Sequence, residues 1–82
     1  MTVRTKAQKD AINDFIKHNG FKNMSKFAES CGLTRMHFSA YYNGRCDPSV
    51  RTLLRWAIIL KCDLEELIEL FYPEEYHEYL YS

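Results

Sequence analysis

The stretch "LTRMHFSAYYNG", residues 33–44, combines side chains that could recognise a partner. Arg35 carries a planar fork of donors that can make two hydrogen bonds to one partner group. Met36 and Ala40 offer only apolar contact. If the stretch is a helix, these three side chains lie away from Phe38 and Tyr41, whose spacing predicts a buried side. The outward side chains could face water, a partner protein or the edges of base pairs.

Residue types that catalyse reactions or bind metals show no useful spacing in this chain. His37 has no acid or cysteine partner at a useful distance along the sequence. The cysteines, Cys31, Cys46 and Cys62, are odd in number and widely spaced, so neither a disulfide nor a zinc site is expected. We expect Cys31 and Cys62 to be small buried residues and Cys46 to be an exposed thiol. The chain is therefore expected to be no enzyme and to need no cofactor.

The 82 residues are expected to form one domain, residues 1–82, with one modest core. No apolar run approaches the roughly 20 residues that span a bilayer. The N-terminal "MTVRTKAQKD" lacks the apolar core of a signal peptide. We therefore expect a soluble, cytoplasmic protein without a membrane partner.

The net charge of zero hides a division along the chain. Residues 1–62 carry all eleven Lys and Arg against four acids, and residues 63–82 carry seven acids and no base, so the two parts have charges of +7 and −7. This asymmetry favours a basic working face with an acidic tail. Two ordinary solvated surfaces would also explain it.

Apolar residues recur with helical periodicity, and strand alternation is missing, so the predicted fold is all-α. The expected helices run from Lys6 to Asn19, from Met24 to Cys31 after the cap Asn23, from Arg35 to Tyr42 after the cap Thr34, from Ser49 to Leu60, and from Leu64 to Phe71 after the cap Asp63. The fourth helix has a broad apolar face made by Val50, Leu53, Leu54, Ala57, Ile58 and Leu60, with Trp56. Pro73 is expected to end the fifth helix. A short acidic, aromatic tail follows, about residues 73–82, and adds a last turn or two.

Two short helices joined by a glycine-containing turn, at about residues 23–44, form a helix-turn-helix arrangement. The longer run "MSKFAESCGLTRMHFSAYYNGRCDPSVRTLLRWAIILKCDLEEL" resembles the lambda-repressor-like, Cro-type (XRE) helix-turn-helix family over about residues 21–70. The matching features are Ala28, Gly32 in the turn, Leu33, Thr34, Phe38, Tyr41, Asn43-Gly44, and the later segments "PSVRTLLRWA" and "DLEEL". The resemblance implies a compact five-helix DNA-binding domain.

Three features depart from the family pattern. Met24 stands where the family usually has a glutamine that supports DNA contacts, so a polar contact is lost. Lys61 stands where glycine commonly ends the fourth helix, and it must take a left-handed conformation or end the helix differently. The loop before the motif looks one residue longer, with Phe21 rather than Lys22 supplying the apolar side chain.

The resemblance implies that the helix from Arg35 to Tyr42 is a recognition helix in the major groove of DNA. Its base-facing residues, by position, are Arg35, Met36, His37, Ser39 and Ala40. Arg35 can pair with guanine, and Met36 and Ala40 can contact thymine methyl groups, so the half-site should mix one guanine with A·T pairs. Candidate contacts to the DNA backbone are Asn23, Lys26, Thr34, Tyr42, Asn43, Arg45 and Arg51. The positive field could be extended by Arg4, Lys6, Lys9, Lys17 and Lys22.

A single module of this size buries little DNA, so we expect a homodimer on a pseudo-palindromic operator, with half-sites about 34 Å apart. Leu70 and Tyr72 lie off the core-facing stripe of the fifth helix. The candidate dimer interface consists of Leu70, Tyr72, Tyr76, Tyr79 and Leu80. Alternatively, the tail folds back over its own core. The acidic end either lies away from the duplex and lowers nonspecific attraction, or docks a basic protein.

The leading hypothesis is a sequence-specific DNA-binding protein, a small transcriptional repressor of bacterial, phage or mobile-element type. The organism type follows from the resemblance alone. The alternative is a protein-interaction module on the same fold, such as an antitoxin or a phage-encoded inhibitor, that binds its partner through the acidic aromatic C-terminal region.

Overall fold

The computed structural model describes residues 4–81, which form six helices and no strand. The helices are α1 (Lys6–His18), α2 (Met24–Ser30), α3 (Arg35–Tyr42), α4 (Val50–Leu60), α5 (Leu64–Phe71) and α6 (Pro73–Tyr81). The all-α prediction is confirmed, and the acidic tail is a sixth helix of nine residues rather than a loose turn. None of the helices in residues 4–81 has both the length and the apolarity to cross a membrane.

Short polar side chains begin three of the helices: Asn23 and Thr34 are predicted caps, whereas Ser49 was expected as the first residue of its helix. The side chains of Asn23, Thr34 and Ser49 each accept a hydrogen bond from the backbone N–H three residues later, at 2.9, 3.0 and 3.2 Å. These bonds satisfy donors that a helix start leaves without a partner. At α1, Thr5 and Gln8 form a reciprocal capping box. The sequence analysis did not predict this capping box, although Thr5 and Gln8 have the required spacing.

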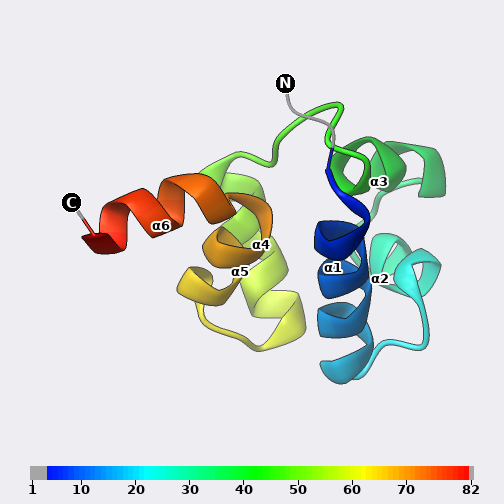
Figure 1. Cartoon of the computed structure of the whole chain (residues 1–82). Coiled ribbons are helices and arrows are strands. Elements are labelled where there is room, and N and C mark those ends of the chain that lie inside the picture. The colour runs from blue at the N-terminus through cyan, green and yellow to red at the C-terminus, as the bar shows by residue number, and fades with distance from the viewer. Residues whose placement is uncertain (1–3, 82) are drawn as a thin grey trace.

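The helices form two groups that meet at α1. Figure 1 shows α1, α2 and α3 on one side of the molecule and α4, α5 and α6 on the other. α1 contacts both α2 and α5, so it joins the two groups. α6 extends away from the rest of the molecule and packs mainly on α5. In this view α6 and α3 lie at opposite ends of the molecule.

Trp56 of α4 lies at the centre of an aromatic cluster. Its ring lies 5.3 Å from the rings of Tyr41 and Phe71, and 5.8 Å from those of Phe27 and Phe38, between centroids. The remaining buried apolar residues are Ile12, Ile16, Ala28, Leu53, Leu60 and Leu67. Because Trp56 contacts α2, α3 and α5 at once, it fixes the positions of these helices relative to α4.

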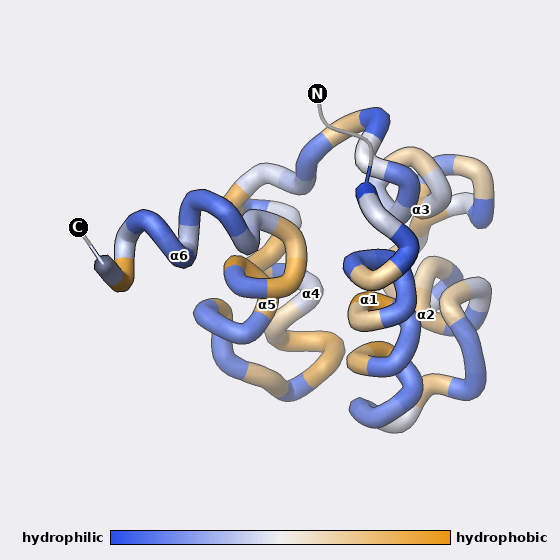
Figure 2. Tube along the Cα trace, in the orientation of Figure 1, coloured by the Kyte–Doolittle hydropathy of each residue, from blue (hydrophilic) through white to orange (hydrophobic). Residues whose placement is uncertain are grey.

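The broad apolar face predicted for α4 is only partly buried, which corrects the sequence prediction. Leu53 and Leu60 face the core, whereas Val50, Leu54 and Ile58 are 63%, 47% and 77% exposed. These three follow one another at intervals of four residues, so they form a separate outer stripe on the helix. Figure 2 shows hydrophobic residues recurring along α4 and α5, in contrast to the largely hydrophilic α6.

Lys61 follows α4 in the left-handed region of the backbone, with φ of 56° and ψ of 45°. This left-handed conformation is the first of the two alternatives that the sequence left open for Lys61. A Cβ atom in this region costs about 1–2 kcal/mol, a cost that glycine avoids.

We predict that Lys61→Gly raises the free energy of unfolding by about 1 kcal/mol, measured by urea denaturation. Lys61→Ala keeps a Cβ atom in the same conformation and is the control, with an expected change below about 0.5 kcal/mol. An equal gain in both variants would show that backbone strain at Lys61 is not the cause.

Candidate nucleic-acid interface

The buried residues of α3 determine which of its side chains face outward. Phe38 is buried and Tyr41 is half-buried, and both contact the aromatic cluster around α4. Because a helix turns by about 100° per residue, Met36 and Ala40 lie on the opposite side. Met36 is 83% exposed, and Arg35 is exposed beside it. The structure thus presents an arginine and an apolar side chain on the free side of an anchored helix.

His37 and Ser39 lie on the two flanks of that free side. The His37 ring is stacked on the Tyr41 ring, with 5.7 Å between centroids. Ser39 is half-buried, and the side-chain amide of Asn43 donates to its hydroxyl and to its backbone carbonyl, each at 2.9 Å. A base contact by Ser39 would therefore share the hydroxyl with Asn43.

A hollow of about 430 Å³ lies beside α3, between α3, α2 and α1. It is lined by Arg35 of α3, by Asn23 and Met24 at the start of α2, and by Asn13 and Lys17 on α1. Asn13 was not singled out in the sequence, although its spacing of four residues from Lys17 places both on one side of α1. These amide and cationic donors on three elements are the groups that contact phosphates in protein–DNA complexes.

Residues near the helix starts flank α3 on one side. Thr34 and Asn23 use their side-chain oxygens to cap α3 and α2. Lys26 lies 3.8 Å from the Glu29 carboxylate, and both side chains are exposed. An exposed ion pair of this kind contributes little, so Lys26 keeps its charge available to a partner.

The remaining candidates lie at the other end of α3 and beyond it. Tyr42 is half-buried, and burial together with the charge of Asp10 raises its pKa, so its hydroxyl stays a protonated donor. Arg45 is exposed in the loop after α3, and Arg51 is exposed in the first turn of α4. Tyr42 and Asn43 line the same hollow as Asn23, whereas Arg45 and Arg51 are not part of its lining.

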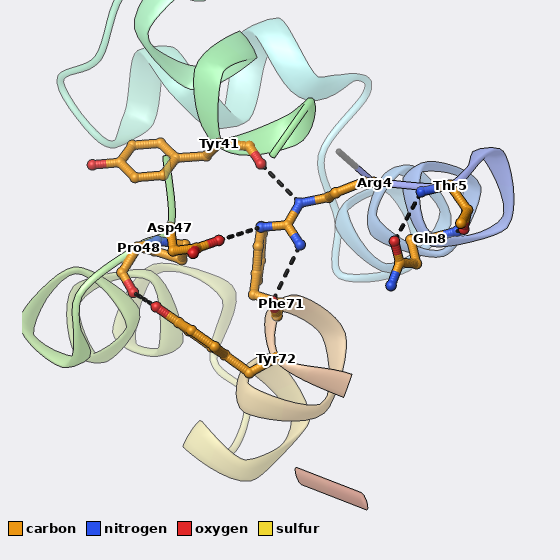
Figure 3. A network of polar contacts seen from close by, with 8 residues as sticks. All are labelled: Arg4, Thr5, Gln8, Tyr41, Asp47, Pro48, Phe71 and Tyr72. Atoms are coloured by element: carbon orange, nitrogen blue, oxygen red, sulfur yellow. Dashed lines mark hydrogen bonds and ion pairs between the residues drawn. The ribbon is translucent and has the colours of Figure 1, made fainter. Parts of the chain in front are cut away.

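Arg4 does not extend a positive field over the surface, which corrects the expectation from sequence. Its side chain is buried. Nε donates to the Tyr41 carbonyl at 2.9 Å, and Nη1 donates to the Phe71 carbonyl at 3.1 Å. Nη2 lies 3.6 Å from a carboxylate oxygen of Asp47 (Figure 3). Burial lowers the pKa of Arg4 and Asp47 opposes that shift, and a guanidinium remains charged in either case.

The two carbonyls that Arg4 binds lie at the ends of two helices. Tyr41 is in the last turn of α3, Phe71 is the last residue of α5, and neither helix has a basic residue in its last turn. The carbonyls of a last turn lack partners within the helix and carry partial negative charge. Arg4 donates a hydrogen bond from its cationic guanidinium to each carbonyl, and so links the end of α3 to the end of α5.

Leu70 and Tyr72, expected on a dimer interface, are half-buried against the core of the chain itself. The Tyr72 hydroxyl donates to the Pro48 carbonyl at 2.5 Å (Figure 3), which fixes the loop between α3 and α4. Tyr76 is half-buried on α6, while Leu80 is exposed. The prediction that Leu70 and Tyr72 lie off the core-facing side of α5 was therefore wrong.

The exposure of Cys46 agrees with the prediction, but Cys31 and Cys62 are less buried than expected. Cys31 and Cys62 are half-buried, and Cys46 is exposed in the loop after α3. Burial raises the pKa of Cys31 to about 11 and also raises the pKa of Cys62. Their thiols thus stay neutral at physiological pH and behave as small apolar groups. Residues 4–81 contain no group of three or more His, Cys, Asp or Glu that could hold a metal ion.

The anchored, outward-facing second helix of the α2–α3 pair defines a domain of the helix-turn-helix class. A family described as the Cro/C1-type HTH DNA-binding domain matches residues 11–72, and the chain belongs to this family. The resemblance read from the sequence is thus confirmed. Arg4 and α6 lie outside the matched residues. No curated protein and no solved structure gives a significant match to the chain.

Proposed function

We propose that this chain, as one helix-turn-helix domain, binds double-stranded DNA sequence-specifically with α3 in the major groove and acts as a transcriptional repressor. The exposure of Met36 carries the proposal. A methionine that is 83% exposed on an anchored helix leaves apolar surface in water, and contact with a thymine methyl group would bury it. The family, one of DNA-binding domains, supports the same function.

In this function Arg35 and Met36 read bases, and the residues around α3 position the helix. The Arg35 guanidinium donates to O6 and N7 of a guanine, while Met36 and Ala40 contact thymine methyl groups. His37 and Ser39 lie at the margins of this contact. Thr34, Tyr42, Arg45 and the other flanking donors bind phosphates, which fixes the register without reading sequence. A dimer bound to two half-sites covers a promoter and excludes polymerase.

The proposal is tested by selection from random duplex DNA at physiological salt. We predict that the wild-type chain enriches a motif with a guanine in each half-site. Arg35→Ala should bind the selected sequence about 5- to 150-fold more weakly, which corresponds to about 1–3 kcal/mol, and should lose the preference at that guanine.

Lys61→Ala is the matched control, because it removes one positive charge at the far end of α4 and should leave the motif unchanged. Failure of the wild-type chain to enrich any motif would refute the proposed function. Weakening by Arg35→Ala that is equal on every sequence would instead assign Arg35 to phosphate.

A second candidate function is a protein-interaction module on the same fold, such as an antitoxin or an inhibitor. The observation that favours it is α6, an acidic helix with no buried residue. The loss of a polar side chain at Met24 also favours it. Under this function, the selection enriches no DNA sequence.

A further inference from the structure

The side chain of Asn43, at the end of α3, makes two hydrogen bonds to one residue of that helix. Its Nδ2 donates to the Ser39 backbone carbonyl and to the Ser39 hydroxyl oxygen, each at 2.9 Å. A carbonyl oxygen can only accept, so the nitrogen of the Asn43 amide, and not its oxygen, faces Ser39. The Ser39 hydroxyl oxygen therefore acts as an acceptor toward Asn43.

The end of α1 has the same arrangement without the hydroxyl. Nδ2 of Asn19 donates to the Phe15 carbonyl at 2.7 Å. Both asparagines thus bind the carbonyl of the residue four positions earlier. Phe15 has no polar side-chain atom, whereas Ser39 does, so only the asparagine that ends α3 also binds a hydroxyl.

The hydrogen of the Ser39 hydroxyl has no acceptor among residues 4–81. A serine within a helix can donate to the carbonyl four residues earlier, which here is that of Arg35, but Ser39 makes no such bond. A hydroxyl that accepts from an amide is also a stronger donor, because linked hydrogen bonds polarise one another. Ser39 therefore offers its hydrogen to an acceptor outside the chain.

This hydrogen is offered on the side of α3 that carries Arg35. The two residues are one turn apart on the helix, and both line the hollow of about 430 Å³ beside α3. Arg35 is exposed and Ser39 is half-buried. A partner that binds along this side of α3 meets the Arg35 guanidinium at one turn and the Ser39 hydroxyl at the next.

We infer that Asn43 makes Ser39 a hydrogen-bond donor to a DNA base, so that the half-site excludes cytosine at one position beside the guanine bound by Arg35. The inference deepens the proposed function and rests on it, because α3 has to lie in the major groove. There guanine, adenine and thymine present acceptors, whereas cytosine presents only its N4 amino donor. A cytosine facing Ser39 would leave the hydroxyl hydrogen without an acceptor in a desolvated contact, which is costly.

The inference gives Asn43 a different role from the phosphate contact expected from the sequence. Its side-chain nitrogen is occupied by Ser39. The remaining amide oxygen is an acceptor and cannot donate to a phosphate. Asn43 is thus a positioning residue that acts through Ser39, and Ser39 is the residue that determines specificity.

The test compares base preferences in selections from random duplex DNA. We predict that the wild-type chain depletes cytosine at least about fivefold at one position beside the guanine that depends on Arg35. Ser39→Ala should lose this depletion and keep the other preferences, since alanine preserves the helix. Asn43→Asp should also lose it although Ser39 is present. A carboxylate accepts the hydroxyl hydrogen and leaves the Ser39 oxygen free to accept from the cytosine amino group.

Two controls separate this effect from that of the added negative charge. Asn19→Asp makes the same change at the end of α1, where the asparagine binds no hydroxyl, and should leave every base preference unchanged. Asn43→Asp combined with Ser39→Ala should have the preferences of Ser39→Ala alone. An added negative charge near DNA lowers affinity for all sequences, so the base preference is the readout.

The bond between Asn43 and Ser39 can also be measured without DNA. In nitrogen-15 NMR spectra of the free chain, the side-chain amide signals of Asn43 should move in Ser39→Ala, while those of Asn19 should stay in place. Asn43 signals that do not move would overturn the inference. This measurement and the selection with Ser39→Ala decide the matter even if Asn43→Asp does not fold.

Failure of this inference can be separated from failure of the proposed function. Enrichment of no motif would reject both. A motif with the guanine that depends on Arg35, but with no depletion of cytosine beside it, would reject the inference alone. So would a depletion that survives in Ser39→Ala or in folded Asn43→Asp. Weakening by Ser39→Ala that is equal on all sequences would assign the hydroxyl to a phosphate and would likewise reject the inference.

Discussion

Replacing Trp56 with alanine is expected to lower the free energy of unfolding by about 3–5 kcal/mol. The Trp56 ring contacts the aromatic rings of α2, α3 and α5, so its removal leaves a cavity where these helices meet. A chain of this length has a total stability of about 4–12 kcal/mol. Much of the folded population should therefore be lost, as measured by urea denaturation followed by circular dichroism.

Trp56→Phe is the matched variant, because it keeps an aromatic ring in the cluster and should cost about half as much. Loss of less than about 1 kcal/mol in Trp56→Ala would contradict the central position assigned to this residue. The effect on DNA binding should follow the folded fraction, since Trp56 is buried and cannot contact DNA directly.

Local features of the sequence predicted the helix-turn-helix well. Asn23 and Thr34 are side-chain caps, and the spacing of Phe27 and Ala28 identifies the core side of α2. Such signals depend on residues within one turn of each other, so a single sequence contains them. The free side of α3 could be predicted for the same reason, because Phe38 and Tyr41 define its opposite side.

Features that depend on distant contacts could not be predicted. Val50, Leu54 and Ile58 have the same types and spacing as core residues, and only the packed structure shows that another side of α4 is buried. Pro73 follows the end of α5 at Phe71, as predicted, but it also begins α6, because proline suits the first position of a helix. No local pattern in the sequence predicts the role of Arg4, because the two carbonyls that it binds lie 37 and 67 residues away along the chain.

We expect Arg4→Met to lower the free energy of unfolding by about 2–4 kcal/mol, measured by urea denaturation. Methionine keeps an apolar stem near the Phe71 ring, over which the guanidinium lies at 5.1 Å, but it donates no hydrogen bond. The Phe71 carbonyl would lose the donor that Arg4 supplies, at about 1–3 kcal/mol, and the Tyr41 carbonyl would lose one of its two donors, because the Gly44 N–H still donates to it at 3.2 Å.

Asp47→Asn separates the contribution of the carbonyls from that of the ion pair. The Asp47 side chain is 48% exposed and lies 3.6 Å from Arg4, so its loss should cost less than about 1 kcal/mol. If Asp47→Asn were as costly as Arg4→Met, the ion pair rather than the binding of helix ends would be the main role of Arg4.

DNA binding by folded Arg4→Met distinguishes a positioning residue from a phosphate contact. Because Arg4 holds the last turn of α3, its loss should weaken binding to the selected sequence about tenfold while leaving the salt dependence unchanged. A residue that bound phosphate would instead reduce the slope of log K against log salt concentration by about 1. An unchanged slope with weaker binding would therefore show that Arg4 acts by positioning α3, through its buried contacts to the carbonyls of Tyr41 and Phe71.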